Sequence, residues 1–436
     1  MKGKGFFFIL CVCMTFISCS NVTEDKNDVR SNDSVLKFLD IQNAKNLYIG
    51  TSNSGTRSAR NAATTQKLFK ITEEGYVEEV KYLDENKKEI TISQQPTVIQ
   101  NVNDDYIFVG FGWSGYVESS YLVRKTDGAV FDMTKAGNPN EIYNDFKNSQ
   151  RIKTDGKNNM YFLSYDTQSL RIVKVNLNGI DALNSSFISA STDYVDVFDV
   201  DWNGNLIYDG YSVSDSSHRL LRVRKSNGGL LNLSDVGAFW IGLDGNIYYS
   251  SNNHEEYKNS ENGEESYGYP IKKITIDLSS GDKEEIYGYI DDFFWTYGSF
   301  KINVKDKIYI IRDSLISEVY NSNNSPRKVS LTSLQLKSVT AVTSSENYYY
   351  VAGLTSTNET VLLKINPDND SFNHILPENE YEVFSFTASE TDGITFNALR
   401  MSDGKKIIGQ VGINGGEVTI LDEESDAEIT YLQRIN

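Results

Sequence analysis

Short apolar segments alternate with polar turns along almost the whole chain after residue 35. An apolar and basic segment runs into a tight turn rich in Gly, Asn and Asp at eight places: 67–75, 121–128, 171–179, 219–228, 271–281, 315–325, 361–370 and 406–416. Another apolar segment precedes each unit, and a shorter one follows it. Segments of this length, bounded by turn residues, predict β-strands, and no helical periodicity continues for ten residues in this part of the chain. The sequence therefore predicts an all-β protein.

The eight turns recur on average about 49 residues apart, a period typical of propellers or solenoids. A fourth apolar segment lies ahead of the other three in several units: 97–102, 194–200, 239–243 and 339–343. Four short antiparallel strands at this spacing resemble a β-propeller blade. YYYVAG (348–353) followed by VLLKINPDND (361–370) is loosely similar to the YVTN-type bacterial propellers; the architecture is WD40-like, but the Trp-Asp dipeptide is absent. The resemblance implies a propeller over 35–436, with eight blades or, as the alternative, seven.

The last apolar segment, 427–435, follows the eighth unit and has the pattern of one additional strand. A closed ring removes the exposed edges of its sheets. We therefore expect this segment to pair with the first blade and close the ring.

The N-terminus has the pattern of a bacterial export signal. Two lysines precede an apolar run at 6–17 that is too short to span a bilayer. The run ends in Phe16-Ile17-Ser18-Cys19, which resembles a lipobox, although Phe16 stands where that pattern usually has Leu. The resemblance implies cleavage before Cys19 and acylation of its thiol; an ordinary secretory signal is the alternative.

This reading divides the N-terminal region into a signal peptide, 1–18, and a lipidated Cys19 with a polar tether, 19–34. The tether contains almost nothing apolar that could pack into a core. Two or three acyl chains anchor a protein stably. We expect an exported outer-membrane lipoprotein, on the periplasmic or the surface face, with the membrane as a partner through its lipid.

Charge and cysteine content narrow the possible functions. The formal net charge is −18, which argues against a nucleic-acid partner because a phosphate backbone requires a basic surface. All three cysteines lie within the first 19 residues. Neither a disulfide framework nor a cysteine metal site is therefore expected, and no metal or cofactor is predicted.

The longest predicted connections, 51–66, 111–120, 134–148 and 250–270, fall on one face of the expected ring. Loops on a rigid scaffold often carry function, and aromatic side chains there can stack on sugars or anchor a protein. For the aromatic residues, packing between blades is the alternative. The candidate ligand or partner residues are Arg57, Arg60, Phe111, Trp113, Tyr116, Tyr257 and Tyr267.

No catalytic motif is recognisable. Residues 199–205 begin like a calcium loop, but Gly210 stands where a bidentate Glu is required, so we interpret them as a turn between strands. The sequence therefore favours a non-enzymatic binding or scaffold module that contacts a protein or glycan through its loop-rich face. The alternative is a carbohydrate-active enzyme, a glycoside hydrolase or polysaccharide lyase, which predicts carboxylates or Arg, Tyr and His converging at the channel mouth.

Overall fold

The computed structural model describes the following residues: 36–52, 65–113, 116–133, 142–143, 152–166, 169–178, 185–187, 193–212, 215–233, 236–258, 264–276, 282–291, 299–312, 315–322, 326–424 and 430–435. Residues 36–436 form a unit of their own. The descriptions below concern this unit. Residues 1–35, which include Cys19, lie outside the described residues.

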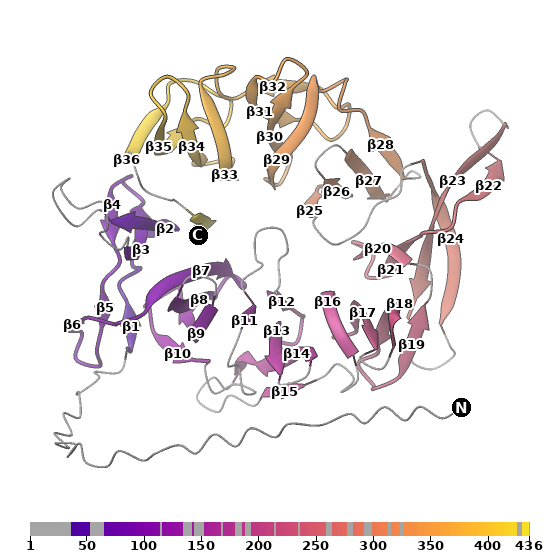
Figure 1. Cartoon of the computed structure of the whole chain (residues 1–436), viewed down its shortest axis with the longest axis horizontal. Coiled ribbons are helices and arrows are strands. Elements are labelled where there is room, and N and C mark those ends of the chain that lie inside the picture. Colours follow the sequence, from indigo (N-terminus) through magenta and orange to yellow (C-terminus); the bar gives the residue numbers. More distant parts are fainter. Residues whose placement is uncertain are drawn as a thin grey trace, which may run out of the picture. The chain divides into compact units, whose positions relative to one another are not determined.

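The unit is a β-propeller built from four-stranded antiparallel blades, as the sequence predicts. The described residues form eight sheets of this kind, two of which carry a fifth strand, and they are numbered as blades in chain order. The number of blades in the complete ring remains a prediction. Figure 1 shows the blades following one another in a ring. A cavity lies between their innermost strands.

The strands of the first four blades are given from the innermost outward. Blade 1 contains Thr430–Arg434 (β37), Ala44–Ser52 (β2), Thr65–Thr72 (β3) and Val77–Glu79 (β4). Blade 2 contains Gln95–Asn101 (β7), Tyr106–Trp113 (β8), Tyr116–Arg124 (β9) and Val130–Asp132 (β10). Blade 3 contains Ile152–Thr154 (β12), Asn159–Asp166 (β13), Ser169–Asn176 (β14) and Ser185–Phe187 (β15). Blade 4 contains Asp193–Val200 (β16), Leu206–Ser212 (β17), Asp215–Arg224 (β18) and Leu230–Leu233 (β19).

The other four blades have the same order. Blade 5 contains Val236–Ile241 (β20), Ile247–Ser251 (β21), Glu265–Thr275 (β23) and Lys283–Ile290 (β24). Blade 6 contains Phe300–Val304 (β25), Lys307–Arg312 (β26), Leu315–Asn321 (β27) and Arg327–Val329 (β28). Blade 7 contains Leu336–Ser344 (β29), Tyr349–Thr355 (β30), Thr360–Ile365 (β31) and Phe372–His374 (β32). Blade 8 contains Tyr381–Ser389 (β33), Gly393–Arg400 (β34), Lys405–Val411 (β35) and Thr419–Glu424 (β36).

Smaller strands decorate this frame. Phe38–Leu39 (β1), Tyr82–Leu83 (β5) and Glu89–Ile90 (β6) form a three-stranded sheet between blades 1 and 2 that the sequence pattern did not predict. Ile142–Tyr143 (β11) pairs with β9. Glu255–Lys258 (β22) pairs with the outer end of β23.

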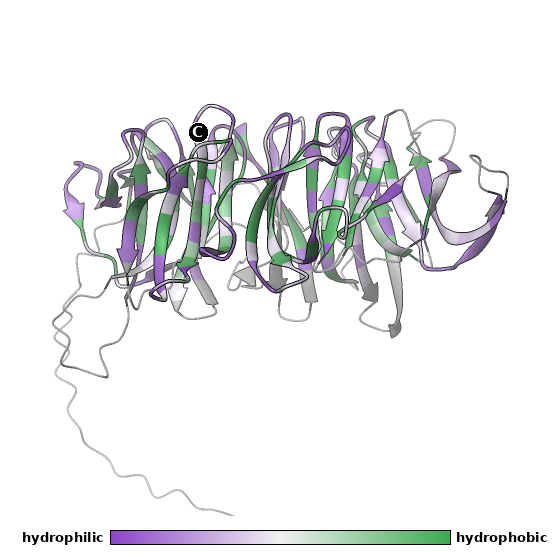
Figure 2. Cartoon of the chain, turned by 90° about the horizontal axis from the view of Figure 1, so that it is seen from above, coloured by the Kyte–Doolittle hydropathy of each residue, from purple (hydrophilic) through white to green (hydrophobic). Residues whose placement is uncertain are grey.

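The core consists of layers between neighbouring blades. The second strand of a blade, such as β26 or β30, is buried on both faces, which is why these strands read as continuous apolar runs in the sequence. One layer joins Ile311 and Ile316 of blade 6 to Val351 and Leu363 of blade 7. Figure 2 shows apolar residues along the strands and hydrophilic residues concentrated toward their ends.

The C-terminal strand closes the ring onto the first blade, and this confirms the prediction for 427–435. β37 runs antiparallel to β2, with Asn46 opposite Arg434 and Ile49 opposite Thr430. Leu432 of this strand and Ile435, which follows it, have buried side chains. Through this pairing, the inner edge of β2 in blade 1 is covered by β37.

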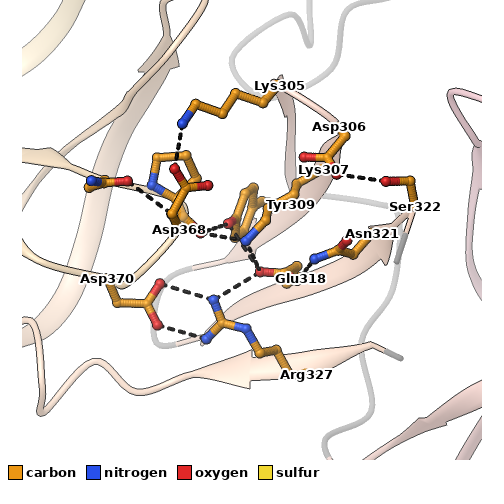
Figure 3. A network of polar contacts seen from close by, with 12 residues as sticks. Lys305, Asp306, Lys307, Tyr309, Glu318, Asn321, Ser322, Arg327, Asp368 and Asp370 are labelled. Carbon is orange, nitrogen blue, oxygen red and sulfur yellow. Dashed lines mark hydrogen bonds and ion pairs between the residues drawn. The ribbon is translucent and has the colours of Figure 1, made fainter. Parts of the chain in front are cut away.

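A buried polar network joins blades 6 and 7 (Figure 3). The Glu318 carboxylate is 1% exposed, and it lies 2.9 Å from the Arg327 guanidinium and 3.4 Å from the Lys307 ammonium. Tyr309 donates its hydroxyl hydrogen to the same carboxylate at 3.1 Å. Arg327 also forms a two-point contact with Asp370 of blade 7, at 2.7 and 3.1 Å. The network therefore fixes the orientation of one blade against the next through fully satisfied charges.

Candidate functional site: the central channel

The central channel is a cavity of about 720 Å³ between the innermost strands. Residues of β7, β12, β16, β20, β25, β29 and β37 line it, so seven of the described blades contribute. Most of its polar lining is uncharged: Gln100, Asn101, Thr154, Ser299, Asn303, Thr343, Ser344 and Gln433. Amides and hydroxyls of this kind can hydrogen-bond a polar ligand but do not select its charge.

Three charged residues from three different blades meet in this channel. Lys301 of β25 donates to Asp199 Oδ2 of β16 at 2.5 Å. The Lys153 ammonium of β12 lies 3.6 Å from the other oxygen of the same carboxylate, Oδ1. The side chains of Lys153, Asp199 and Lys301 are 17%, 12% and 27% exposed. Two cations thus share one anion, which gives the charged lining of the cavity a net charge of +1.

The electrostatics of this cluster follow from its burial. Burial alone would raise the pKa of the Asp199 carboxyl, but the ammonium groups of Lys153 and Lys301 outweigh that effect and hold the pKa at about 2. The Val200 N–H donates to the same carboxylate at 3.1 Å. Burial lowers the pKa of the Lys153 amine, and Lys301 lowers it further, while Asp199 opposes both effects. Asp199 therefore remains ionised, and the protonated form of Lys153 is disfavoured relative to an exposed lysine.

The local sequence explains why these side chains enter the channel. Each belongs to the innermost strand of its blade. Asp199 and Lys301 have apolar residues on both sides, whereas Lys153 lies between Ile152 and Thr154. Successive side chains of a strand point to opposite faces. A lysine within the short first strand of a repeat, as in Ile152–Thr154 and Phe300–Val304, is a signal that could have identified the cluster. Sequence reasoning did not single out either lysine.

The neighbouring acidic residue, Asp201, has a different role. Its Oδ1 accepts the N–H groups of Asn203 at 2.8 Å and Asn205 at 2.7 Å. This is an Asx-type turn between β16 and β17, which confirms the interpretation of 199–205 as a turn. Among the described residues, no group of three or more His, Cys, Asp or Glu side chains could hold a metal ion.

Of the predicted loop residues, the structure describes the side chains of Phe111, Tyr257 and Tyr267, and these belong to two different blades. Arg57 and Arg60 lie outside the described residues. Phe111 is fully buried and packs edge-on against Tyr82 and Tyr121, so its prediction as a surface ligand contact was wrong. The packing alternative holds for this residue because Phe111 belongs to the apolar core around blades 1 and 2.

Two of the predicted long loops are strands in the structure. Within 111–120, β8 ends at Trp113 and β9 begins at Tyr116, and these two residues pair with each other across a tight hairpin. For Trp113 and Tyr116 only the backbone is described.

Segment 250–270 contains the hairpin of β22 and β23. Tyr257 stacks on Tyr289 with ring centroids 4.1 Å apart, and Tyr267 is 59% exposed beside His254. The hairpin extends blade 5, and none of these tyrosines lines the channel.

The fold and the channel define a β-propeller with a charged central cavity. No protein-family model matches the chain, and no curated protein matches it. Solved structures match with low identity. A protein from Bacteroides uniformis, provisionally named a 6-phosphogluconolactonase, is 9% identical with a TM-score of 0.37, over 88% of this chain and 100% of that one.

Two further matches are parts of peptidases. The propeller domain of the Trilobed protease from Pyrococcus furiosus is 8% identical with a TM-score of 0.40, over 76% of this chain and 95% of that one. A prolyl endopeptidase is 10% identical with a TM-score of 0.44, over 84% of this chain and 55% of that one. At these identities, the similarity shows the fold alone.

These findings correct the functional prediction. The prediction of a non-enzymatic scaffold that acts through a loop-rich face is withdrawn, because two of the matching propellers are provisionally named 6-phosphogluconolactonases and others are parts of peptidases. The geometry also places a charged cluster, Lys153, Asp199 and Lys301, in the channel. The glycoside hydrolase alternative predicts paired carboxylates, and among the described residues that line the cavity Asp199 is the single acidic one.

Within the described residues, the structure contains no helix long and apolar enough to cross a membrane.

Proposed function

We propose that the protein binds a small anionic molecule in its central channel, with Lys153 and Lys301 as the groups that recognise the charge. The observation that carries this proposal is the sharing of one carboxylate, Asp199, by two ammonium groups inside a partly enclosed cavity. A ligand carboxylate or phosphate adds a second anion to this cluster. Such contacts are stronger in a channel than on an exposed surface because less water screens them.

The uncharged lining favours a hydroxylated or otherwise hydrogen-bonding ligand. Asn101 and Asn303 carry amides, and Thr154 and Thr343 carry hydroxyls, along the same channel. These groups can both donate and accept hydrogen bonds. The proposed ligand class is therefore small organic acids and phosphorylated metabolites, rather than a polymer or an apolar molecule.

The test is titration calorimetry of the purified chain with inorganic phosphate, lactate and gluconate at constant ionic strength. Lys301→Gln removes one cation and leaves the main chain as it is. We expect it to weaken anion binding at least several-fold. Lys337→Gln is the matched control, because Lys337 is exposed, donates to Asn358 at 2.8 Å and is not among the residues that line the channel. Equal binding by wild type and Lys301→Gln, or no binding of any anion, would refute the proposal.

We also propose that the chain is exported and lipidated at Cys19 and resides at the outer membrane. The support is the N-terminal pattern alone: two lysines, a short apolar run and a lipobox-like Phe16-Ile17-Ser18-Cys19. Protease treatment of intact cells, against a known periplasmic control, distinguishes a surface from a periplasmic location.

A further inference from the structure

We propose that Trp202, in the turn between β16 and β17, is a stacking platform for the pyranose ring of a saccharide. The site lies on the turns that join the two innermost strands of blades 3 and 4. Neither Trp202 nor Gly156, on which its ring lies, is among the residues that line the channel. This site is therefore separate from the anion site of the proposed function and adds a second ligand class.

The indole ring of Trp202 lies flat on a neighbouring blade. Trp202 is 77% exposed, the highest value among the large apolar residues in the described part of the chain. A Cβ at Gly156, in the turn between β12 and β13, would lie 2.2, 2.4 and 2.5 Å from the indole atoms Cε2, Cδ2 and Nε1. Because Cε2 and Cδ2 are shared by the two fused rings, such a position lies above the ring plane. The Gly156 main chain thus covers one face of the indole, and the exposure of Trp202 leaves the opposite face to solvent.

Hydrogen bonds between the two turns hold this arrangement. The Gly156 N–H donates to the Trp202 carbonyl oxygen at 3.2 Å. The Lys157 ammonium donates to the Asn203 carbonyl oxygen at 2.6 Å. Within the same turn as Trp202, the Asp201 carboxylate accepts the Asn203 N–H at 2.8 Å. The main chain on both sides of the ring is therefore held in place, so that binding requires little further ordering of the protein.

A comparison of the two turns shows that the turn itself does not require tryptophan. Asp155 begins the turn of blade 3 and Asp201 that of blade 4, and each accepts the main-chain N–H groups two and four residues further on. The next position is Gly156 in blade 3 and Trp202 in blade 4. Isolated exposed apolar side chains are common on protein surfaces. Trp202 differs from them because its ring lies on a glycine, where any side chain would displace it.

The surroundings of the ring favour a saccharide over a protein partner. Among the described residues of the two turns, 155–158 and 201–205, Trp202 is the single exposed large apolar one. A protein interface has a wider apolar core. A pyranose ring instead combines a face of C–H groups, which can stack on an indole, with hydroxyls at its edge. The exposed Lys157 and Asn203 lie in the same two turns and carry donors and an acceptor for such hydroxyls.

The experiment is titration calorimetry of the full chain with three neutral oligosaccharides: cellotetraose, mannotetraose and chitotetraose. Neutral probes carry no charged group for the lysines of the channel. We expect at least one probe to bind, and Trp202→Ala to weaken that binding at least ten-fold by removing the stacked ring. Trp202→Phe keeps a smaller ring and should lose less. Gly156→Ala leaves the tryptophan in the chain but displaces its ring, and it should also weaken binding.

Leu243→Ala is the matched control. Leu243 is an apolar residue, 47% exposed, in the corresponding turn of blade 5, between β20 and β21. Its replacement should leave saccharide binding unchanged. Equal affinity of wild type and Trp202→Ala, an equal loss in Trp202→Ala and Leu243→Ala, or no binding of any of the three probes would refute the proposal.

Adenosine and inorganic phosphate separate this site from the alternatives. Binding of adenosine that depends on Trp202, without binding of any saccharide, would replace the saccharide by a nucleobase and overturn the assignment. Phosphate binding that Lys301→Gln weakens and Trp202→Ala leaves unchanged, together with the reverse dependence for the saccharide, supports two separate sites. Absence of saccharide binding overturns this inference alone, whereas absence of anion binding overturns the proposed function alone.

Discussion

Replacement of Glu318 by Gln tests whether the polar network between blades 6 and 7 stabilises the propeller. The side chain keeps its shape but loses its charge, at a position that is 1% exposed. Lys307 and Arg327 then lose the carboxylate that lies 3.4 and 2.9 Å away. Arg327 retains Asp370, and Lys307 retains the Pro367 carbonyl at 2.5 Å. The expected loss in the free energy of unfolding is therefore about 3 kcal/mol, at the lower end of the range for breaking a buried ion pair.

This free energy converts into a measurable change in melting temperature. Globular proteins have an unfolding entropy of about 2.1 cal/mol/K per residue, so a unit of roughly 400 residues has about 0.8 kcal/mol/K. A loss of about 3 kcal/mol therefore lowers Tm by about 4 °C. Calorimetry and urea unfolding followed by both tryptophan fluorescence and far-UV circular dichroism measure it. Coincident transitions establish that one free energy describes the unfolding.

The control is Glu346→Gln, the same chemical change at an exposed residue at the start of the turn between β29 and β30. We expect it to change stability by less than about 0.5 kcal/mol. Equal effects of the Glu318 and Glu346 substitutions would mean that the network contributes no more than a surface charge. The reasoning from burial and ion pairing would then be wrong.

Four further outcomes follow from single features of the chain. The Asp199 carboxylate stabilises wild type by about 2 kcal/mol above pH 4 and loses this contribution as the pH falls toward 2, because its folded-state pKa of about 2 lies below the unfolded value of 3.8. Asp199→Asn should abolish this contribution, and unfolding measured along an acid titration tests it. Gly128→Ala should strongly lower the free energy of unfolding in urea, because a Cβ there would lie 2.0 Å from the Leu39 carbonyl oxygen at a φ of 71°. Gly228→Ala, with open space around it, should lower it by only about 1 kcal/mol, the cost of its positive φ. Leu432→Ala should cost about 2–4 kcal/mol by removing a buried side chain from the closing strand, and a Tm unchanged from wild type would argue against ring closure by β37. Cys19→Ala should eliminate metabolic labelling by an alkyne palmitate analogue, and persistent labelling would place the lipid elsewhere or reject the lipobox interpretation.

Much of the fold could be predicted because blade strands have a strong local signature. The turn residues at the ends of the repeats adopt the left-handed backbone that Gly and Asn tolerate: Gly75, Gly128 and Gly228 all have positive φ. Strands buried on both faces, such as β26, leave continuous apolar runs. The closing strand was predictable for a different reason, since one strand remained after the last complete unit.

The connections between strands were predicted less well. The length of a connection in the sequence does not show whether its residues extend the flanking strands or form a loop. The stretch around Trp113 prolongs β8 and β9 until they meet in a tight hairpin. The glutamate-rich stretch after β21 pairs as β22 and β23, even though a charge run reads as a solvated loop. Cross-strand hydrogen bonds and aromatic stacking, as between Tyr257 and Tyr289, decide these cases.

The sequence alone determined the class of structure: repeated strands, their turns, the extra C-terminal strand and the candidate export signal. Each depends on residues that are close together in the chain, so local pattern is sufficient to reveal it. The channel cluster was decided by tertiary structure. Lys153, Asp199 and Lys301 come from separate repeats. The ring places their three strands innermost, and this arrangement brings both lysines to the Asp199 carboxylate. Their shifted pKa values arise from that burial and proximity, which no single repeat contains.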